Sequence, residues 1–178
     1  MAYTLFYSPD SANVVVRMAL EEIGASYEAL EVDRRQQAQS SPAFLKFNPQ
    51  GLLPVLVDPA QDEPLFETAA IVLHLADQHG VLKPVAAAAR GRFLKWLFYL
   101  SNTLHADLRM LFYTDRYASG PEAIAALQTR LHARVLGHLG LVEQDRLVRI
   151  DPAGDQGSGH FKGVLAQFGR GVRHRNRV

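Results

Sequence analysis

The fold of this chain is decided by NPQGLLPVLVD at residues 48–58 and its continuation LFETAAI at residues 65–71. A turn containing proline and glycine leads into a short apolar strand, and a hairpin bounded by proline leads into a second strand. An acidic residue and a hydroxyl residue then open a helix. Pro54 has no N–H group to give to a sheet, so it has to stand at the start of its strand. This position favours a cis peptide bond between Leu53 and Pro54.

The residues on either side of this stretch complete a small α/β domain. Residues 3–7 and 27–32 have strand patterns, and residues 13–23 between them have the apolar spacing of a helix. A strand, a helix and a strand joined by short connections imply that the two strands pair in parallel. Ser41 and Pro42 then open a short helix through about residue 47, and the helix that begins at Thr68 runs to about His79. The predicted order is βαβαββα.

Beyond this domain the sequence predicts helices alone. Residues 85–117 contain no proline and are predicted as one long helix or two, and Pro121 opens another helix that ends near residue 145. We therefore expect an α/β domain at residues 1–79, an all-α domain at residues 85–146 and a tail at residues 147–178.

Composition excludes several kinds of chemistry. The chain has no cysteine, which excludes a CxxC redox centre, a thiolate metal site and a cysteine nucleophile. Its seven histidines show no metal-ligand spacing, so we predict no metal. No apolar run reaches membrane length, and no basic segment precedes an apolar stretch at the N-terminus. We therefore expect a cytoplasmic protein with no membrane partner.

Charge is distributed unevenly along the sequence. Residues 1–146 hold 13 Lys and Arg against 16 Asp and Glu, whereas residues 147–178 hold 6 against 2. The tail is also rich in glycine and resembles out-of-frame or foreign coding sequence. A nucleic-acid contact through residues 170–177 is the alternative, but no interleaved aromatic residues or binding-fold signature support it. We predict no nucleic-acid partner.

With these elements identified, residues 48–58 and LFETAAIVLHLAD at residues 65–77 resemble the glutathione-binding half of the glutathione S-transferase family. That family has a thioredoxin-like N-terminal domain and an all-helical C-terminal domain. WLFYLSNTLH at residues 96–105 and LFY at residues 111–113 are similar to the bacterial, beta-type branch. The resemblance covers residues 3 to about 146. It implies a homodimeric enzyme that joins glutathione to hydrophobic electrophiles or reduces peroxidic small molecules.

The resemblance also implies which residues hold glutathione. Leu53, just before Pro54, takes the place of a residue whose backbone pairs with the cysteinyl part of glutathione, as in strand addition to an open sheet edge. Glu67 and Thr68 match the acidic and hydroxyl residues that hold the γ-glutamyl group at a helix N-terminus. Alternatively, Thr68 only caps its helix and Glu67 is a solvated acid. His105 matches a histidine near the active cleft, or satisfies a hydrogen bond in the core.

The residue that activates the glutathione thiol is less closely defined. The family uses a Tyr, Ser or Cys at the end of the first strand or in the turn after it, and one hydrogen bond to the thiolate supplies about 1.5–3 kcal/mol. This chain offers Tyr7, Ser8 and Ser11, with Asn13 as an amide donor, and Ala12 stands at the beta-type cysteine. Ser11 is the first catalytic candidate because it lies directly before the helix, and Tyr7 is the second. The alternatives are a helix cap for Ser11 and a half-buried strand residue for Tyr7.

The sequence departs from the family at two places. Leu52 stands where a polar residue often touches glutathione, and the capped core helix and later helices of the C-terminal domain have no counterpart, so we expect a truncated helical domain. The alternative function is therefore a non-catalytic binding protein of this fold or an inactive truncated product. A third hypothesis, a thiol-disulfide oxidoreductase of the thioredoxin type, is nearly excluded because this chain has no cysteine. Candidates for the electrophile site, which also suit a core, are Phe98, Tyr99, His105, Leu108, Phe112 and Tyr113.

Overall fold

The computed structural model of the chain describes residues 2–9, 11–81 and 87–147. The tail was predicted at residues 147–178, and everything after Leu147 lies outside the described residues. The suggested nucleic-acid contact and the resemblance to out-of-frame coding sequence concern that part of the chain. The described residues form two compact units, one up to Arg109 and the other from Met110 to Leu147. The domain boundaries predicted from the sequence stay a prediction.

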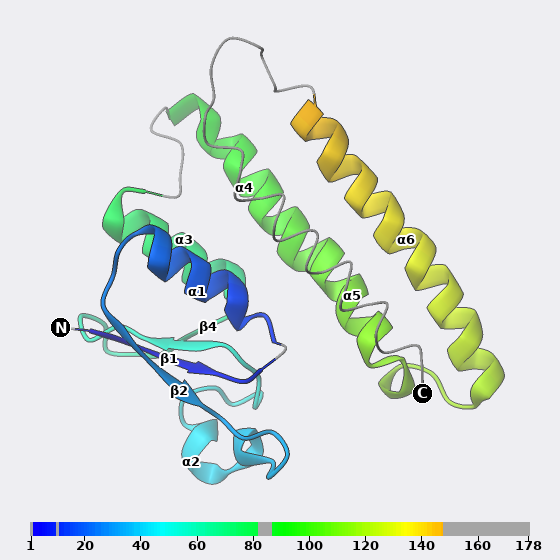
Figure 1. Ribbon diagram of the computed structural model, residues 1–178, viewed down its shortest axis with the longest axis horizontal. Coiled ribbons are helices and arrows are strands. Elements are labelled where there is room, and N and C mark those ends of the chain that lie inside the picture. The colour runs from blue at the N-terminus through cyan, green and yellow to red at the C-terminus, as the bar shows by residue number, and fades with distance from the viewer. Residues whose placement is uncertain (1, 10, 82–86, 148–178) are drawn as a thin grey trace. The chain divides into compact units, whose positions relative to one another are not determined.

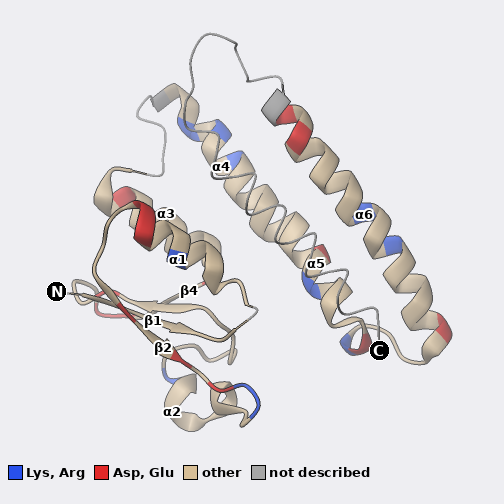
Figure 2. Cartoon of the chain, in the orientation of Figure 1, with Lys and Arg blue, Asp and Glu red and all other residues tan. Residues whose placement is uncertain are grey.

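A four-stranded mixed sheet forms the centre of the first unit (Figure 1). In the order β2-β1-β3-β4, its strands are β2 (Tyr27–Glu31), β1 (Tyr3–Tyr7), β3 (Val55–Val57) and β4 (Leu65–Phe66). β1 and β2 are parallel, whereas β3 is antiparallel to both of its neighbours. The order βαβαββα and the thioredoxin-like class of this unit are confirmed. β2 is an exposed edge strand, and its acidic residues (Figure 2) oppose pairing with another sheet.

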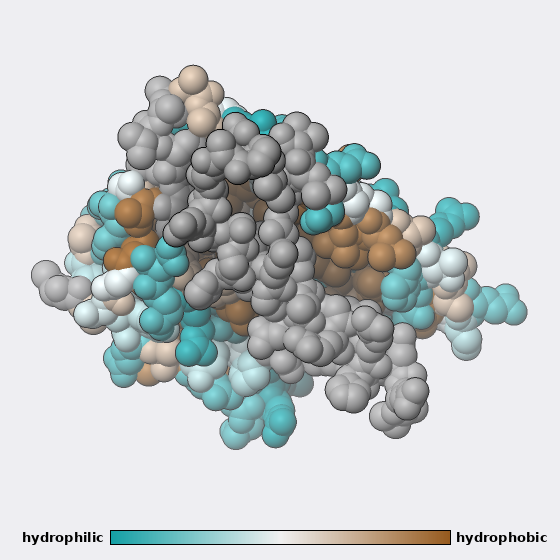
Figure 3. Space-filling view, turned by 45° about the horizontal axis from the view of Figure 1, so that its top comes forward, coloured by the Kyte–Doolittle hydropathy of each residue, from teal (hydrophilic) through white to brown (hydrophobic). Residues whose placement is uncertain are grey.

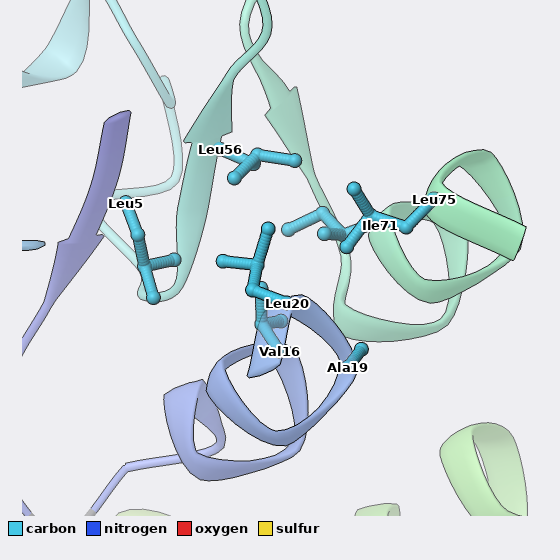
Figure 4. Packing of buried hydrophobic residues seen from close by; sticks show 7 residues of the cluster. All are labelled: Leu5, Val16, Ala19, Leu20, Leu56, Ile71 and Leu75. Atoms are coloured by element: carbon cyan, nitrogen blue, oxygen red, sulfur yellow. The ribbon is translucent and has the colours of Figure 1, made fainter. Parts of the chain in front are cut away.

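Helices cover both faces of the sheet. α1 (Asn13–Glu22) and α3 (Thr68–His79) lie on one face, where Leu5 of β1 and Leu56 of β3 point toward them (Figure 4). The cluster there consists of Leu5, Val16, Ala19, Leu20, Leu56, Ile71 and Leu75. α2 (Pro42–Leu45) covers the other face with an aromatic cluster of Phe6, Phe44 and Phe47. Successive strand residues point to opposite faces, so β1 contributes to both clusters.

Residues 85–117, predicted as one long helix or two, contain two α-helices joined by a π-helical segment. After a 3-10 turn at Ala87–Ala89 come α4 (Arg90–Tyr99), a π-helical segment at Leu100–Leu104 and α5 (His105–Phe112). A further 3-10 turn at Thr114–Arg116 follows, so helical structure among the described residues reaches close to the predicted end at residue 117. In the second unit, α6 (Pro121–Leu147) begins at the predicted proline. Within the described ranges, no helix has the length and apolar character needed to cross a membrane.

Large apolar side chains are exposed on the helices of both units. Figure 3 shows such surface in brown on the face in view. On the helices after residue 87 and the turn that follows α5, these residues are Phe98, Leu100, Phe112, Tyr117, Leu136, Leu139 and Leu141.

Gly51 is expected to tolerate no side chain. Its φ is +63°, and a Cβ atom built on it would lie 2.9 Å from the backbone oxygen of Gln39. Gly24 is the matched control, since its φ is +67° but a Cβ atom there would meet nothing within 4 Å. Gly24→Ala should cost about 1–2 kcal/mol of unfolding free energy, the cost of the left-handed backbone. Gly51→Ala should cost about 1–3 kcal/mol more from the added clash, as measured by urea unfolding. Equal losses in the two variants would contradict this reading.

Asp58 links the end of β3 to α3. Its carboxylate is buried, lies 2.7 Å from His74 Nε2 and accepts a hydrogen bond of 2.9 Å from the Ala60 N–H. Burial acts to raise the pKa of Asp58, but the hydrogen bonds from Ala60 and His74 outweigh it, so the pKa lies below its usual value of 3.8. A carboxyl group with a lowered pKa stabilises the fold above its unfolded pKa, and this contribution is lost as the pH falls through the folded value.

We therefore expect Asp58→Asn to lose about 1–3 kcal/mol of unfolding free energy at neutral pH. Urea unfolding from neutral pH down to below about pH 4 measures how this contribution changes with pH. The unfolding free energy of wild type should approach that of the variant as Asp58 becomes protonated. A difference between the two proteins that is independent of pH would exclude the ionised pair as its cause.

Candidate functional site

The sheet register brings three loops to one end of the sheet. Phe6 of β1 pairs with Val55 of β3, which in turn pairs with Phe66 of β4. The loop after β1, the residues just before β3 and the residues just after β4 therefore lie together. This end of the sheet, formed by residues 8–9, 11–13, 52–54 and 67–68, is termed the site edge. It brings together Ser11, Leu53, Pro54, Glu67 and Thr68, all predicted from the sequence.

The loop after β1 is held by a buried asparagine. Asn13 is 3% exposed, and its side-chain Nδ2 lies 2.8 Å from the Ser8 carbonyl oxygen and 2.8 Å from Ser11 Oγ. Ser8 is buried as well, which leaves Ser11 as the more accessible of the two serines. The residue at the N-cap of α1 is Ala12, whose side chain caps nothing. Besides the short hydrogen bond from Asn13 Nδ2, Ser11 Oγ accepts a longer contact of 3.4 Å from the Asn13 N–H.

The loop before β3 presents an unpaired backbone. Asn48, 2% exposed, donates from Nδ2 to the Leu52 carbonyl at 3.0 Å and accepts at Oδ1 from the Gln50 N–H at 3.0 Å. The peptide bond between Leu53 and Pro54 is cis, as predicted. Among the described residues, the N–H and C=O groups of Leu53 have no hydrogen-bond partner. An unpaired peptide group at a strand start is suited to an extended peptide ligand.

The N-terminus of α3 is open. Its N-cap residue is Glu67, not Thr68, and no side chain caps it; the Glu67 carbonyl accepts from the Ile71 N–H at 3.0 Å. Glu67 has φ +69° and ψ 111°, a conformation that non-glycine residues rarely adopt and that is concentrated at functional sites. The reading of Thr68 as the cap of its helix is therefore wrong. Uncapped N–H groups at a helix N-terminus attract carboxylates, and the exposed Glu67 carboxylate attracts a cation.

His105 lies within electrostatic range of the site edge. It is the first residue of α5 and is exposed. Partial desolvation lowers the pKa of its imidazole, the positive charge of Arg109 lowers it further, and the negative charge of Glu67 opposes both. The imidazole is therefore neutral near pH 7.

Together these groups suit one kind of ligand. Leu53 offers a peptide N–H and C=O, the start of α3 offers N–H groups and the Thr68 hydroxyl, and Glu67 offers a carboxylate. Ser11 adds a hydroxyl near the start of α1. A small peptide with a free carboxylate, an ammonium group and an ionisable side chain would find a partner for each group.

Tyr7 lies in different surroundings from Ser11. Its ring packs against the core cluster under α1, and the Arg17 guanidinium lies 5.7 Å from the ring centroid. Asn13, which the sequence offered as an amide donor, donates to the Ser8 carbonyl and to Ser11 Oγ. The role of Asn48 was not revealed by the sequence, since its hydrogen bonds depend on loop conformation. Of the electrophile candidates, Phe98 and Phe112 are exposed, and Tyr99, Leu108 and Tyr113 are partly buried.

A depression of about 370 Å³ lies at the opposite end of the sheet, where Tyr3 begins β1 and Asp58 follows β3. There the Tyr3 hydroxyl lies 2.9 Å from His79 Nε2. None of the predicted site residues lines it. The described residues contain no group of three side chains that could hold a metal ion.

Comparison with known proteins finds relatives of both the sequence and the fold. Residues 1–77 match the family model "Glutathione S-transferase, N-terminal domain". The disulfide-bond oxidoreductase YfcG of Escherichia coli K12 is 34% identical over 100 residues, which are 53% of this chain and 46% of YfcG. Glutathione S-transferase 3 of Zea mays is 36% identical over 114 residues, 61% of this chain and 50% of that protein. The chain thus spans about half the length of these curated relatives.

Among solved structures, a Burkholderia graminis glutathione transferase with two glutathione molecules bound per subunit has a TM-score of 0.72 and 30% identity. The similarity covers 80% of this chain and 61% of that one. A glutathione transferase homologue from Sulfitobacter with bound glutathione has a TM-score of 0.72 and 25% identity. The similarity covers 81% of this chain and 70% of that homologue.

Proposed function

We propose that the chain, whose residues 1–77 match the N-terminal domain of the glutathione S-transferase family, binds glutathione at the site edge and uses it as a co-substrate. The observation that carries the proposal is the convergence of the unpaired Leu53 backbone with the uncapped start of α3. Each of these elements suits one part of glutathione, and relatives of similar fold have glutathione bound.

In this proposal each part of glutathione has its own partner. The cysteinyl N–H and C=O pair with the C=O and N–H of Leu53, which continues the ladder of the sheet. The γ-glutamyl carboxylate accepts from the Thr68 hydroxyl and the first N–H groups of α3, and its ammonium group lies against Glu67. The thiol then faces the loop of Ser11.

Ser11 is proposed to stabilise the thiolate, with Tyr7 as the second candidate. A free thiol is mostly protonated at neutral pH, and each pKa unit of lowering requires about 1.4 kcal/mol of preference for the anion. One hydroxyl hydrogen bond to the thiolate lowers the thiol pKa by about one or two units. The partial positive charge at the start of α1 stabilises the thiolate further. The thiolate sulfur attacks the electrophilic carbon of a hydrophobic substrate, a C–S bond forms, and the leaving group departs with its electron pair. His105 is proposed to line the cleft beside Glu67.

Disulfide exchange is the second candidate reaction. Its support is that YfcG, a relative of this chain, is named a disulfide-bond oxidoreductase. The thiolate of bound glutathione would attack one sulfur of a disulfide, form a mixed disulfide with it, and release the other sulfur as a thiolate. No protein thiol is needed for this exchange. We further propose a cytoplasmic homodimer, as the family resemblance implies.

Parallel assays at saturating glutathione test the function. One follows conjugation to an aryl halide and the other follows reduction of a small disulfide. Turnover in the first supports transfer, and turnover in the second alone supports disulfide exchange. Glutathione binding with neither activity would favour the non-catalytic alternative. A folded protein that neither binds nor turns over glutathione would overturn the proposal.

A further inference from the structure

We propose that Asn13 is a positioning residue of this site: its side-chain amide donates to Ser11 Oγ and thereby keeps the Ser11 hydroxyl hydrogen directed at the glutathione sulfur. The inference rests on the proposed function, because it concerns the group that stabilises the thiolate. Asn13 itself does not touch glutathione in this proposal, and it acts through Ser11.

The placement of Asn13 is fixed by burial. It is the first residue of α1, and at 3% exposure it lies beneath the loop rather than in it. From there its Nδ2 reaches the Ser8 carbonyl at 2.8 Å and Ser11 Oγ at 2.8 Å, and it has a longer contact of 3.4 Å with the Ser11 carbonyl. A buried amide with two short hydrogen bonds holds its rotamer and the loop together.

The Ser8 carbonyl decides which way round the Asn13 amide lies. A carbonyl oxygen only accepts, so the atom 2.8 Å from it has to be the NH₂ group and not the amide oxygen. The same NH₂ group also faces Ser11 Oγ. Because one hydrogen of this NH₂ group is donated to the Ser8 carbonyl, the other is donated to Ser11 Oγ.

The direction of this bond sets the role of the Ser11 hydroxyl. A serine hydroxyl has one hydrogen to donate and two acceptor positions. In the described part of the chain, both groups that contact Ser11 Oγ are donors: Asn13 Nδ2 at 2.8 Å and the Asn13 N–H at 3.4 Å. The hydroxyl hydrogen of Ser11 is therefore left for the ligand. Accepting a hydrogen bond also polarises the hydroxyl and makes it a stronger donor.

The surrounding charges favour an anion at the same point. The first turn of α1 contains no acidic residue, and its acidic residues Glu21 and Glu22 stand at its far end (Figure 2). Within α1, therefore, no acidic side chain offsets the partial positive charge at the helix start. Asn13 aligns the hydroxyl with this charge.

The test measures the pKa of the bound glutathione thiol from the ultraviolet absorbance of its thiolate, in the full chain. Asn13→Asp is the sharpest variant, because the carboxylate has the same shape but has no hydrogen to give and would take the hydrogen of Ser11. We expect the pKa of the bound thiol to rise by about one unit or more, a tenfold loss of thiolate at a pH below the wild-type value. Asn13→Ala, which buries no charge, should raise it by less and carries the test if Asn13→Asp does not fold.

Two controls separate positioning from general loss of structure. Asp58→Asn removes a buried polar contact at the opposite end of the sheet, so it should lower stability and leave the pKa of the bound thiol unchanged. Binding of S-methylglutathione, which has no ionisable thiol, should change less than about twofold in Asn13→Ala. In the Ser11→Ala background, adding Asn13→Ala should produce no further shift of the thiol pKa.

The outcomes distinguish this inference from the proposed function. If Ser11→Ala raises the thiol pKa but both Asn13 variants leave it at the wild-type value, positioning by Asn13 is overturned and the function stands. An equal effect of Asn13→Ala with and without Ser11 also overturns it. If wild type fails to bind glutathione, or Ser11→Ala leaves the thiol pKa unchanged, the proposed role of Ser11 fails and the inference fails with it.

Discussion

Ser11→Ala is expected to lower kcat/KM for the glutathione reaction by about 10- to 100-fold. The hydroxyl is proposed to donate one hydrogen bond to an anion, which is worth about 1.5–3 kcal/mol. The loss should appear mainly in kcat and in the pH profile, since the peptide part of glutathione is proposed to bind at Leu53 and at the start of α3. Steady-state kinetics across the pH range, with glutathione saturating, measures both.

Tyr7→Phe is the matched control for the Ser11 variant. It removes a hydroxyl and keeps the ring that packs under α1 against the core cluster. We expect a change of less than about threefold in kcat/KM, since the Ser11 hydroxyl is proposed to stabilise the thiolate. If Tyr7→Phe produced the large loss and Ser11→Ala the small one, the two residues would exchange roles.

Ile71→Ala is expected to lower the unfolding free energy by about 2–5 kcal/mol. Ile71 is fully buried between α1 and the sheet, within the cluster of Figure 4. Its removal leaves a cavity where α3 meets the strands, and a domain of this size has a total stability of only about 5–15 kcal/mol. The Ile71 N–H also bonds to the Glu67 carbonyl, so disturbance there reaches the site edge. Urea unfolding followed by circular dichroism measures the loss.

Val15→Ala provides the comparison for this core variant. Val15 is 44% exposed on the outer face of α1, so its truncation to alanine removes little buried apolar surface. We expect a change within about 0.5 kcal/mol. A loss as large as that of Ile71→Ala would mean that this face of α1 is covered in the folded protein.

The sequence predicted the N-terminal unit well because its signals are local. Pro54 marked the start of β3, Thr68 and His79 marked the limits of α3, and the alternation in residues 3–7 marked β1. Strand pairing then followed from the short connections. Each of these features depends on neighbours in sequence or on the lack of an N–H group in proline, so the amino-acid pattern alone carries it.

Other features depend on contacts that a sequence pattern does not contain. The pair of Asp58 and His74 is 16 residues apart and forms only when β3 and α3 pack together. Glu67 rather than Thr68 is the N-cap of α3, because the chain leaves β4 with a positive φ that no propensity for glutamate would suggest. The π-helical segment at Leu100–Leu104 lies in an unbroken apolar pattern and has no signature of its own.

Calorimetric titration of the full chain with glutathione tests the central claim most directly. The variant to run beside wild type is Thr68→Val, which keeps the shape of the side chain and removes the hydroxyl at the open start of α3. Our account predicts saturable binding by wild type and affinity lower by about tenfold in the variant. Absence of heat from a wild-type protein that is folded by circular dichroism would contradict it, as would equal affinity of the two proteins.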